Sequence, residues 1–252
     1  MKCIILAAGY ATRLFPLTLN TPKPLVDVGG KPMIEHILEK VAALDNVEEV
    51  FVVTNEIFYP SFYEWSLNFQ ENYPIKLKVI NDGTTSNENR LGAIGDILFV
   101  LEAAQFEDDL LVIAGDNLFE FSLVDFMAVH EKTKAPVLAV YDIADPEAAK
   151  KFGVVALDQD NRLIDFVEKP KEPKSTLIAT ACYFFPESAV PLIYDYLDAD
   201  NPPDRPGDFV AWLYKKEPVY CFVATDSWFD IGSHESLKDA DKHFKGKNKT
   251  LE

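Results

Sequence analysis

A short apolar segment near the start of the chain constrains the fold most strongly. Residues 3–7 are almost purely apolar and lead directly into a loop that contains Gly9, Thr12 and Arg13. An unbroken apolar run of this length is typical of a strand buried on both faces of a parallel sheet. Small loop residues let backbone N–H groups approach an anion, so the segment predicts a phosphate-binding loop. Taken alone, the same loop is equally consistent with a tight connection.

A second cation follows the loop in a stiffened backbone. Lys23 lies between Pro22 and Pro24, and each proline restricts both its own φ angle and the residue before it. A stiff segment that carries one cation suits a phosphate clamp. Neither the G-x-x-x-x-G-K-[ST] nor the G-x-G-x-x-G pattern occurs in the chain, so neither of these phosphate-binding motifs is present.

The order of apolar and amphipathic segments predicts an α/β fold with a doubly wound, mostly parallel, Rossmann-like sheet. Helical spacing of apolar residues around 34–44 and 94–104 alternates with strand-like runs, which favours right-handed β-α-β units. The strand-like runs of the first half are residues 2–7, 49–54, 75–80, 110–114 and 136–141. Ligands of such sheets bind at the carboxyl ends of the strands, where the first loop lies.

The second half is richer in strands. Segments 154–157, 163–167 and 177–185 are expected to form a small β-rich lobe that covers the mouth of the sheet. The remaining segments predict helices at 186–197 and 208–216, a strand at 219–224, and a closing helix at 233–244 with Ser233 as its cap.

The charge of the chain excludes some classes of partner. The chain has 252 residues and a formal net charge of −17, from 24 Lys and Arg against 41 Asp and Glu. A protein this acidic is a poor candidate for nonspecific binding to nucleic acid or a membrane surface, so we expect neither partner. Anionic substrates still fit if a few cations and a metal ion reverse the field locally.

The cysteines indicate the compartment. Cys3, Cys182 and Cys221 each lie in an apolar run, no C-x-x-C pattern occurs, and the four histidines have no zinc-like spacing. We interpret them as buried thiols of a cytoplasmic protein. The first apolar run is interrupted at Arg13, too early for a signal peptide, and no apolar stretch reaches the ~20 residues of a membrane helix.

Two acidic residues that follow apolar segments are candidate metal ligands. Asp116 lies in the string G-D-N at 115–117, and Asp230 lies in the string W-F-D-I-G at 228–232. For Asp116 alone, an Asx turn is the competing interpretation. Asp230 has large apolar neighbours in sequence, where an unpaired carboxylate is costly, so it needs a cationic partner. Two carboxylates with nucleotide phosphates are typical ligands of Mg²⁺, so the pair predicts a magnesium site.

Together these strings resemble the signature of the sugar-1-phosphate nucleotidylyltransferases. The match runs from Leu6 to Leu25, continues at 30–34, and includes G-D-N and W-x-D-I-G in the family's order. The resemblance implies one nucleotidyltransferase domain over 1–245, with a nucleotide-binding half to about 145, a sugar-phosphate-binding half from about 146, and a tail at 246–252. The family's second loop glycine is Ala11 here, and alanine resists a positive φ angle, so we expect a slightly altered loop path.

The resemblance also implies a reaction and a set of site residues. The enzyme would transfer a nucleoside monophosphate from an NTP to a sugar 1-phosphate, with Mg²⁺ held by Asp116 and Asp230. Arg13 would stabilise the departing pyrophosphate, and Lys23 would contact the α-phosphate. The nucleotide-binding residues implied by the family are Leu6, Ala8, Gly9, Thr12, Arg13, Lys23 and Gly92.

Two further strings match the family's sugar-phosphate site. They are K-F-G-V-V at 151–155 and V-E-K-P at 167–170. The resemblance implies that the backbone of Gly153 meets the sugar hydroxyls, that Glu168 accepts from two of them, and that Lys169 contacts the phosphate. Thr180 falls where relatives often place a polar residue near the sugar, although a threonine in a strand is usually structural.

The resemblance leaves the base and the sugar open. The loop at 81–91 departs from the family pattern, and Arg90 has no family role. One alternative is a cytidylyltransferase that acts on phosphocholine or another phosphorylated alcohol. Glu168 argues against it, because phosphocholine has no hydroxyls and its cation prefers an aromatic cage. The other alternative is a non-catalytic regulatory module, which would have no need of the charged residues implied for catalysis.

Overall fold

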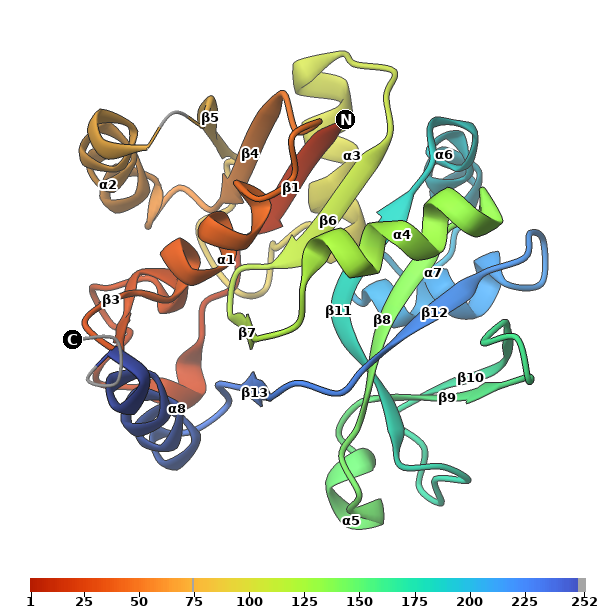
Figure 1. Ribbon diagram of the computed structural model, residues 1–252. Helices are drawn as coiled ribbons and strands as arrows, with labels where there is room; N and C mark the ends of the chain where they lie inside the picture. Colours follow the sequence, from red (N-terminus) through yellow and green to blue (C-terminus); the bar gives the residue numbers. More distant parts are fainter. Residues whose placement is uncertain (74, 249–252) are drawn as a thin grey trace.

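The strand β1 (Lys2–Leu6) lies inside a nine-stranded sheet in the computed structural model, which describes residues 1–73 and 75–248 (Figure 1). It pairs in parallel with β4 (Glu49–Thr54) on one side and β6 (Leu110–Ala114) on the other. β4 pairs in parallel with β5 (Leu77–Asn81). The prediction of a mostly parallel α/β sheet in this half is confirmed. Because β1 and β6 are neighbours, the loop after β1 and the turn after β6 meet at one edge of the sheet.

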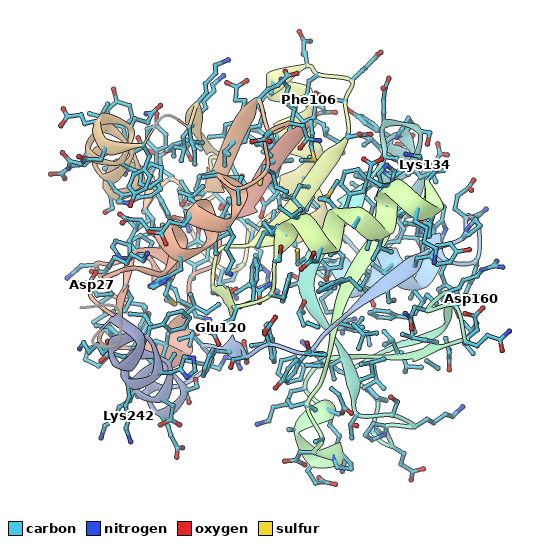
Figure 2. All side chains as sticks on the ribbon, viewed as in Figure 1. Asp27, Phe106, Glu120, Lys134, Asp160 and Lys242 are labelled. Carbon is cyan, nitrogen blue, oxygen red and sulfur yellow. The ribbon has the colours of Figure 1, made fainter. Side chains whose placement is uncertain are left out.

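Helices cover both faces of the sheet, as the apolar run at 3–7 predicted. Cys3 and Ile5 face one core, while Ile4 faces the other, and none of the three is exposed. The first core includes residues of α1 (Met33–Val41), α2 (Tyr59–Asn72) and α4 (Leu123–Thr133). The second core includes residues of α3 (Ala93–Ala104), α6 (Pro191–Asp198) and α7 (Pro206–Leu213). Figure 2 shows side chains filling the space between sheet and helices.

The strand β11 (Leu177–Phe185) corrects the expectation of a separate lobe. Residues 182–185 pair antiparallel with β6, so β11 belongs to the central sheet. Its first residues pair with β8 (Val137–Asp142), and Ile178 pairs with β9 (Gly153–Leu157). A strand of nine residues is long enough to take part in both regions, which the apolar pattern alone did not reveal.

Five consecutive strands, beginning with β8, form a closed ring. β9 pairs with β10 (Leu163–Glu168), and their connection carries Asp160 at its tip (Figure 2). Arg162, just before β10, bridges to Tyr220 of β12 (Tyr220–Ala224), and β12 pairs in parallel with β8. The short helix α5 (Pro146–Ala149) joins β8 to β9, and Asp145 caps it by accepting from the N–H groups of Glu147 and Ala148.

The chain closes with a helix on a third, smaller core. α8 (His234–Asn248) packs near β2 (Asp27–Val28) and β3 (Lys31–Pro32), with Ile231 and Ala240 buried between them. Ser233 caps the helix, since its Oγ accepts from the N–H of Ser236 at 3.1 Å. The predicted helix end at 244 is too early, because α8 continues to Asn248. The rest of the predicted tail, 249–252, lies outside the described residues.

Within the described part of the chain, no helix is both long and apolar enough to cross a membrane.

A buried carboxyl pair lies at the start of α3 and makes stability depend on pH. Asp96, in the first turn of α3, is 6% exposed, and Asp82, after β5, is 7% exposed. Each has one carboxyl oxygen without a hydrogen-bond partner among the described residues. Burial, and then the charge of Asp82, raise the pKa of Asp96 to about 8. Because the folded-state pKa exceeds the unfolded value, folding stability is lost as pH rises from about 4 through 8.

The substitution Asp96→Asn is therefore expected to raise the melting temperature, by an amount that grows between pH 5 and pH 9. Asparagine keeps the shape and can donate to Asp82 at every pH. The gain at pH 9 is expected to reach a few kcal/mol, or roughly 5–10 °C for a chain of this size. Thermal unfolding at both pH values tests this, with the exposed first-turn residue Asp125 of α4, changed to Asn, as the matched control. An equal gain at both pH values would contradict the raised pKa of Asp96 as the cause.

Candidate active site

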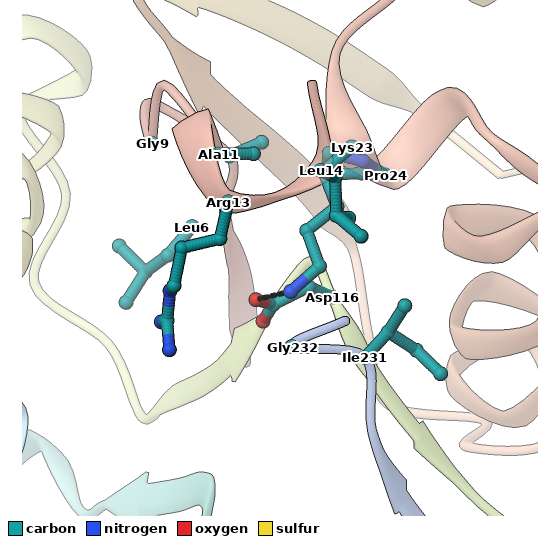
Figure 3. A pocket seen from close by; sticks show the side chains of 11 residues that line it. Leu6, Gly9, Ala11, Arg13, Leu14, Lys23, Pro24, Asp116, Ile231 and Gly232 are labelled. Carbon is teal, nitrogen blue, oxygen red and sulfur yellow. Dashed lines mark hydrogen bonds and ion pairs between the residues drawn. The ribbon is translucent and has the colours of Figure 1, made fainter. Parts of the chain in front are cut away.

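The loop after β1 and the turn after β6 enclose a cavity of about 230 Å³ at the carboxyl edge of the sheet. We call it the first cavity. Lys23, Arg13 and Asp116 supply its charged side chains (Figure 3). Leu6 and Gly9, both predicted from the sequence, also line it. The predicted phosphate-binding loop and the G-D-N string are thus brought together.

Lys23 and Asp116 form an ion pair across this cavity. The Nζ of Lys23 lies 2.6 Å from an Oδ of Asp116, and Figure 3 shows the contact as a dashed line. The side chain of Lys23 is only 11% exposed, whereas that of Asp116 is 40% exposed. Lys23 begins a 3₁₀ turn (Lys23–Leu25) between its two prolines, so the stiff backbone aims its side chain at the carboxylate.

Asp230 comes from the other end of the chain and lies close enough to Asp116, Lys23 and Arg13 for their charges to act on it. It ends the short strand β13 (Trp228–Asp230), which pairs antiparallel with β7 (Asn117–Phe119) so that Asp230 lies opposite Asn117. More than a third of Asp230 is accessible to water, so it is less enclosed than its apolar neighbours in sequence suggested. The surrounding protein nevertheless raises its pKa, the charge of Asp116 adds to this, and Lys23 and Arg13 oppose it.

Asn117 connects the segment that carries Asp116 to the segment that carries Asp230. Its side-chain amide donates to the carbonyl of Thr180, and its Oδ1 accepts from the indole N–H of Trp228 at 2.5 Å. Asn117 is 4% exposed and directly follows Asp116. Buried hydrogen bonds of this kind fix side chains in one arrangement, so the positions of Asp116 and Asp230 are coupled through the backbone that carries them.

In the first loop, Ala11 adopts the left-handed backbone conformation that an alanine was expected to resist. Ala11 has a φ of 45° and a ψ of 40°, in the left-handed region. Its carbonyl accepts from the hydroxyl of the buried Thr18 at 2.8 Å, which holds the loop in place. Ala11 therefore adopts the positive φ angle that alanine resists, because tertiary contacts overcome the cost of the left-handed conformation. Ala8 is buried and its carbonyl accepts from Asn55, while the exposed Thr12 begins a 3₁₀ turn outside the cavity lining.

A second cavity, of about 470 Å³, adjoins the first. We call it the acceptor-side cavity. Gly153, Glu168 and Lys169, predicted from the sequence, all line it, as do Arg13 and Asp230. Arg13 therefore lines both cavities. Burial raises the pKa of Glu168, whose side chain is 14% exposed, and the ammonium of Lys169 opposes the shift from 3.8 Å away.

Four predicted residues lie outside both linings: Ala8 and Thr12 of the first loop, and also Thr180 and Gly92. Thr180 is 1% exposed and its hydroxyl donates to the carbonyl of Ala139, so its side chain has a structural role. Its neighbours Ala179 and Ala181 line the acceptor-side cavity instead. The register of β11 shifts between Ala179 and Tyr183, which places the small residues where the polar one was expected. Gly92 caps α3, is absent from both linings and packs against Asp204.

Two cations of the acceptor-side cavity were not predicted. Lys151 begins the predicted string K-F-G-V-V but was given no role there, and Arg205 lies in the string N-P-P-D-R-P, just before the helix predicted at 208–216. Arg205 donates to Asp208 at 2.9 Å. The sequence did contain a signal for a helix start, because Arg205 is followed by Pro206 and Gly207. No local pattern, however, indicated that this helix lies beside Glu168.

The sequence profile described as "Nucleotidyl transferase" matches residues 2–246. The chain belongs to this family. The prediction of nucleotidylyltransferase resemblance is confirmed, and the match covers both cavities.

The relatives of this nucleotidyl transferase carry different names. It is 34% identical to "Bifunctional protein GlmU" of Methanocaldococcus jannaschii over 99% of this chain and 56% of the relative. It is 28% identical to mannose-1-phosphate guanylyltransferase of Mycobacterium tuberculosis over 94% of this chain and 62% of that protein. The chain thus spans between half and two thirds of the length of these curated relatives.

A solved structure supports the fold along its whole length. The fold matches a candidate glucose-1-phosphate thymidylyltransferase from Bacillus anthracis, crystallised in complex with sucrose, with a TM-score of 0.81 and 26% identity. The alignment covers 97% of this chain and 95% of that one. The α/β fold class that the sequence predicted is confirmed.

Proposed function

We propose that this nucleotidyl transferase moves a nucleoside monophosphate from an NTP to a sugar 1-phosphate, which gives an NDP-sugar and pyrophosphate. The observation that carries the proposal is that Arg13 lines both cavities. One cavity holds Lys23 and Asp116, and the other holds Glu168 and Lys169. Two anions bound side by side would meet at Arg13, as two phosphates must before one attacks the other.

The reaction needs no general base. The second pKa of a phosphate monoester is about 6, so the attacking group is already largely dianionic at neutral pH. No histidine is among the described residues that line either cavity. The protein's task is to align the two phosphates and to offset their repulsion, which positioned cations perform.

Asp116 and Asp230 fit a magnesium ion. The pairing of β13 with β7 brings the two carboxylates to one place. Among the described residues, no group of three or more His, Cys, Asp or Glu side chains could hold a metal ion by itself. This composition suits Mg²⁺, which takes one or two carboxylates and completes its shell with phosphates and water. The ion would supply positive charge to the α-phosphate.

We assign the remaining charges by position. Lys23, now paired with Asp116, is placed to contact the α-phosphate, and Arg13 is placed to stabilise the departing pyrophosphate with its two-pronged fork. Lys169, with Lys151 and Arg205, surrounds the acceptor phosphate. Glu168 accepts hydrogen bonds from sugar hydroxyls. The low exposure of its carboxylate on the acceptor side matches this role. The free, buried cysteines are in keeping with a reducing cytoplasm.

One observation favours a second candidate. Phe152, Phe166 and Tyr183 line the acceptor-side cavity beside Glu168. Aromatic rings and a carboxylate are also the groups that recognise a quaternary ammonium. A cytidylyltransferase that acts on phosphocholine therefore remains the alternative acceptor chemistry.

Pyrophosphate release with Mg²⁺ tests the proposal. Each NTP is paired with hexose and N-acetylhexosamine 1-phosphates and with phosphocholine. Release with one sugar phosphate would confirm the class and identify base and sugar together. Release only with phosphocholine would replace the sugar with the alternative acceptor. If folded protein that still binds nucleotide releases no pyrophosphate with any pair, the result would favour a regulatory module.

Gly207→Ala tests the position of Glu168. A Cβ at Gly207 would lie 2.2 Å from Oε2 of Glu168, so the carboxylate must move. We expect the acceptor KM to rise roughly 10-fold, which corresponds to the loss of about one hydrogen bond to a charged group. The NTP KM should stay unchanged. Steady-state kinetics measure both constants. Gly246→Ala is the control, because a Cβ there meets nothing within 4 Å. Unchanged acceptor KM would contradict the role of Glu168.

A further inference from the structure

The loop between β5 and α3 is fastened to a segment far away in sequence. Gly92, the last residue before α3, has a φ of 82° and lies so close to Asp204 that a Cβ would be 2.6 Å from its Cα. The N–H groups of Ala93 and Ile94 donate to the carbonyls of Asp204 and Pro203, at 3.2 and 2.8 Å. The first N–H groups of a helix have no partner within it, and here residues 203–204 supply the acceptors.

Arg90 adds a two-pronged ion pair to the same junction. Its Nε and one Nη donate to the two carboxyl oxygens of Asp204, at 2.9 and 3.1 Å. Its other Nη donates to the side-chain oxygen of Asn87 at 2.8 Å and to the backbone oxygen of the same residue. A guanidinium in this arrangement fixes both distance and orientation, which a lysine could not.

The junction continues directly into the acceptor-side cavity. Asp204 is followed by Arg205, Pro206 and Gly207, and all three line that cavity. Arg205 is held in turn by Asp208. A short stretch of backbone therefore connects the loop at 81–92 to a cation of the acceptor side.

The ion pair between Arg90 and Asp204 contributes little to global stability, because the two side chains are 41% and 48% exposed. Its effect is on geometry. We propose that Arg90 is a positioning residue, which fixes Asp204 and thereby places Arg205 in the acceptor-side cavity. The kinetic consequence rests on the proposed function, whereas the structural consequence does not.

Hydrogen exchange in the ligand-free protein tests the structural consequence. Arg90→Gln, Asp204→Asn and the double variant are each compared with the wild type over a peptide that covers 203–210. We expect exchange to rise about 3- to 10-fold in all three, since the segment loses the same constraint. The control is Lys134→Gln at the end of α4 (Figure 2), which breaks the ion pair with Glu131 in the opposite helix layer and is expected to change nothing there. Unchanged exchange in Arg90→Gln would overturn the proposal.

Kinetics test the functional consequence, with the substrate pair that the pyrophosphate assay selects. We expect the acceptor KM to rise about 3- to 10-fold in both single variants, with kcat and the NTP KM within about twofold. The double variant should match the single ones, and Arg90→Lys should be intermediate. Additive effects in the double variant, or a change in the NTP KM alone, would overturn the positioning role. If the wild type releases no pyrophosphate with any acceptor, the proposed function fails and the exchange experiment still decides the role of Arg90.

Discussion

Asp230→Asn is expected to lower pyrophosphate release by ~10²–10³ while leaving the fold intact. The substitution keeps the shape of the side chain and removes only its negative charge. With Asp116 alone, the site would offer one carboxylate to the metal, and the α-phosphate would lose the positive charge that the ion supplies. Because the surroundings already raise the pKa of Asp230, removal of the charge relieves repulsion with Asp116, and the melting temperature should stay constant or rise slightly.

The measurement combines turnover with thermal unfolding of the same preparation. Asp226→Asn, an exposed carboxylate four positions earlier, is the control and should retain full activity. Turnover of Asp230→Asn within about threefold of the wild type would contradict its assignment as a metal ligand.

Arg13→Ala is expected to reduce kcat by a similar ~10²–10³, for a different reason. Among residues 1–73 and 75–248, no side chain forms an ion pair or hydrogen bond with the guanidinium of Arg13, which is exposed at the junction of the two cavities. The guanidinium is therefore available for a ligand. Within the protein it acts on Asp230 only through its charge, so its loss should change the melting temperature little. In the proposed role its charge would act where pyrophosphate departs, so the effect should appear in kcat more than in the NTP KM.

Arg13→Lys separates charge from geometry. Lysine keeps the positive charge and loses the fork that contacts two oxygens, so we expect an intermediate loss of about 10-fold or more. Single-turnover kinetics with saturating NTP measure the chemical step directly. A normal rate in Arg13→Ala would contradict the role at the pyrophosphate and leave Arg13 as a surface residue.

The sequence predicted the parts of the site that follow strands directly. The apolar run at 3–7, the loop to Arg13 and the G-D-N string all concern neighbours in sequence, and the parallel pairing of β1 with β6 brings them together. Glu168 and Gly153 followed from strings that belong to one hairpin, which the antiparallel pairing of β9 with β10 places face to face. Local patterns suffice where the decisive contacts lie at strand ends or within a hairpin.

The remainder depends on contacts that no local pattern encodes. The pairing of Asp230 with Asn117 joins positions far apart in the chain, and only tertiary structure selects that partner. Thr180 was assigned to the sugar, but the register shift in β11 turns it toward Ala139. The sequence alone gives no role for Arg90, because its partner Asp204 is distant in the chain. Ala11 shows the opposite effect, since local preference was outweighed by surrounding contacts.

The strand β11 has a consequence for how such a protein can diversify. Ladder hydrogen bonds tie it to β6, next to Asp116, while its other part supplies the small residues of the acceptor-side wall. One strand therefore links the neighbourhood of Asp116 to the acceptor-side wall. The β9–β10 hairpin pairs with β11 at Val154, and the loop before α7 carries Arg205. Under the proposed function, we expect exchange of these two segments between homologues to change the acceptor preference and to leave β1 and β6 unaltered.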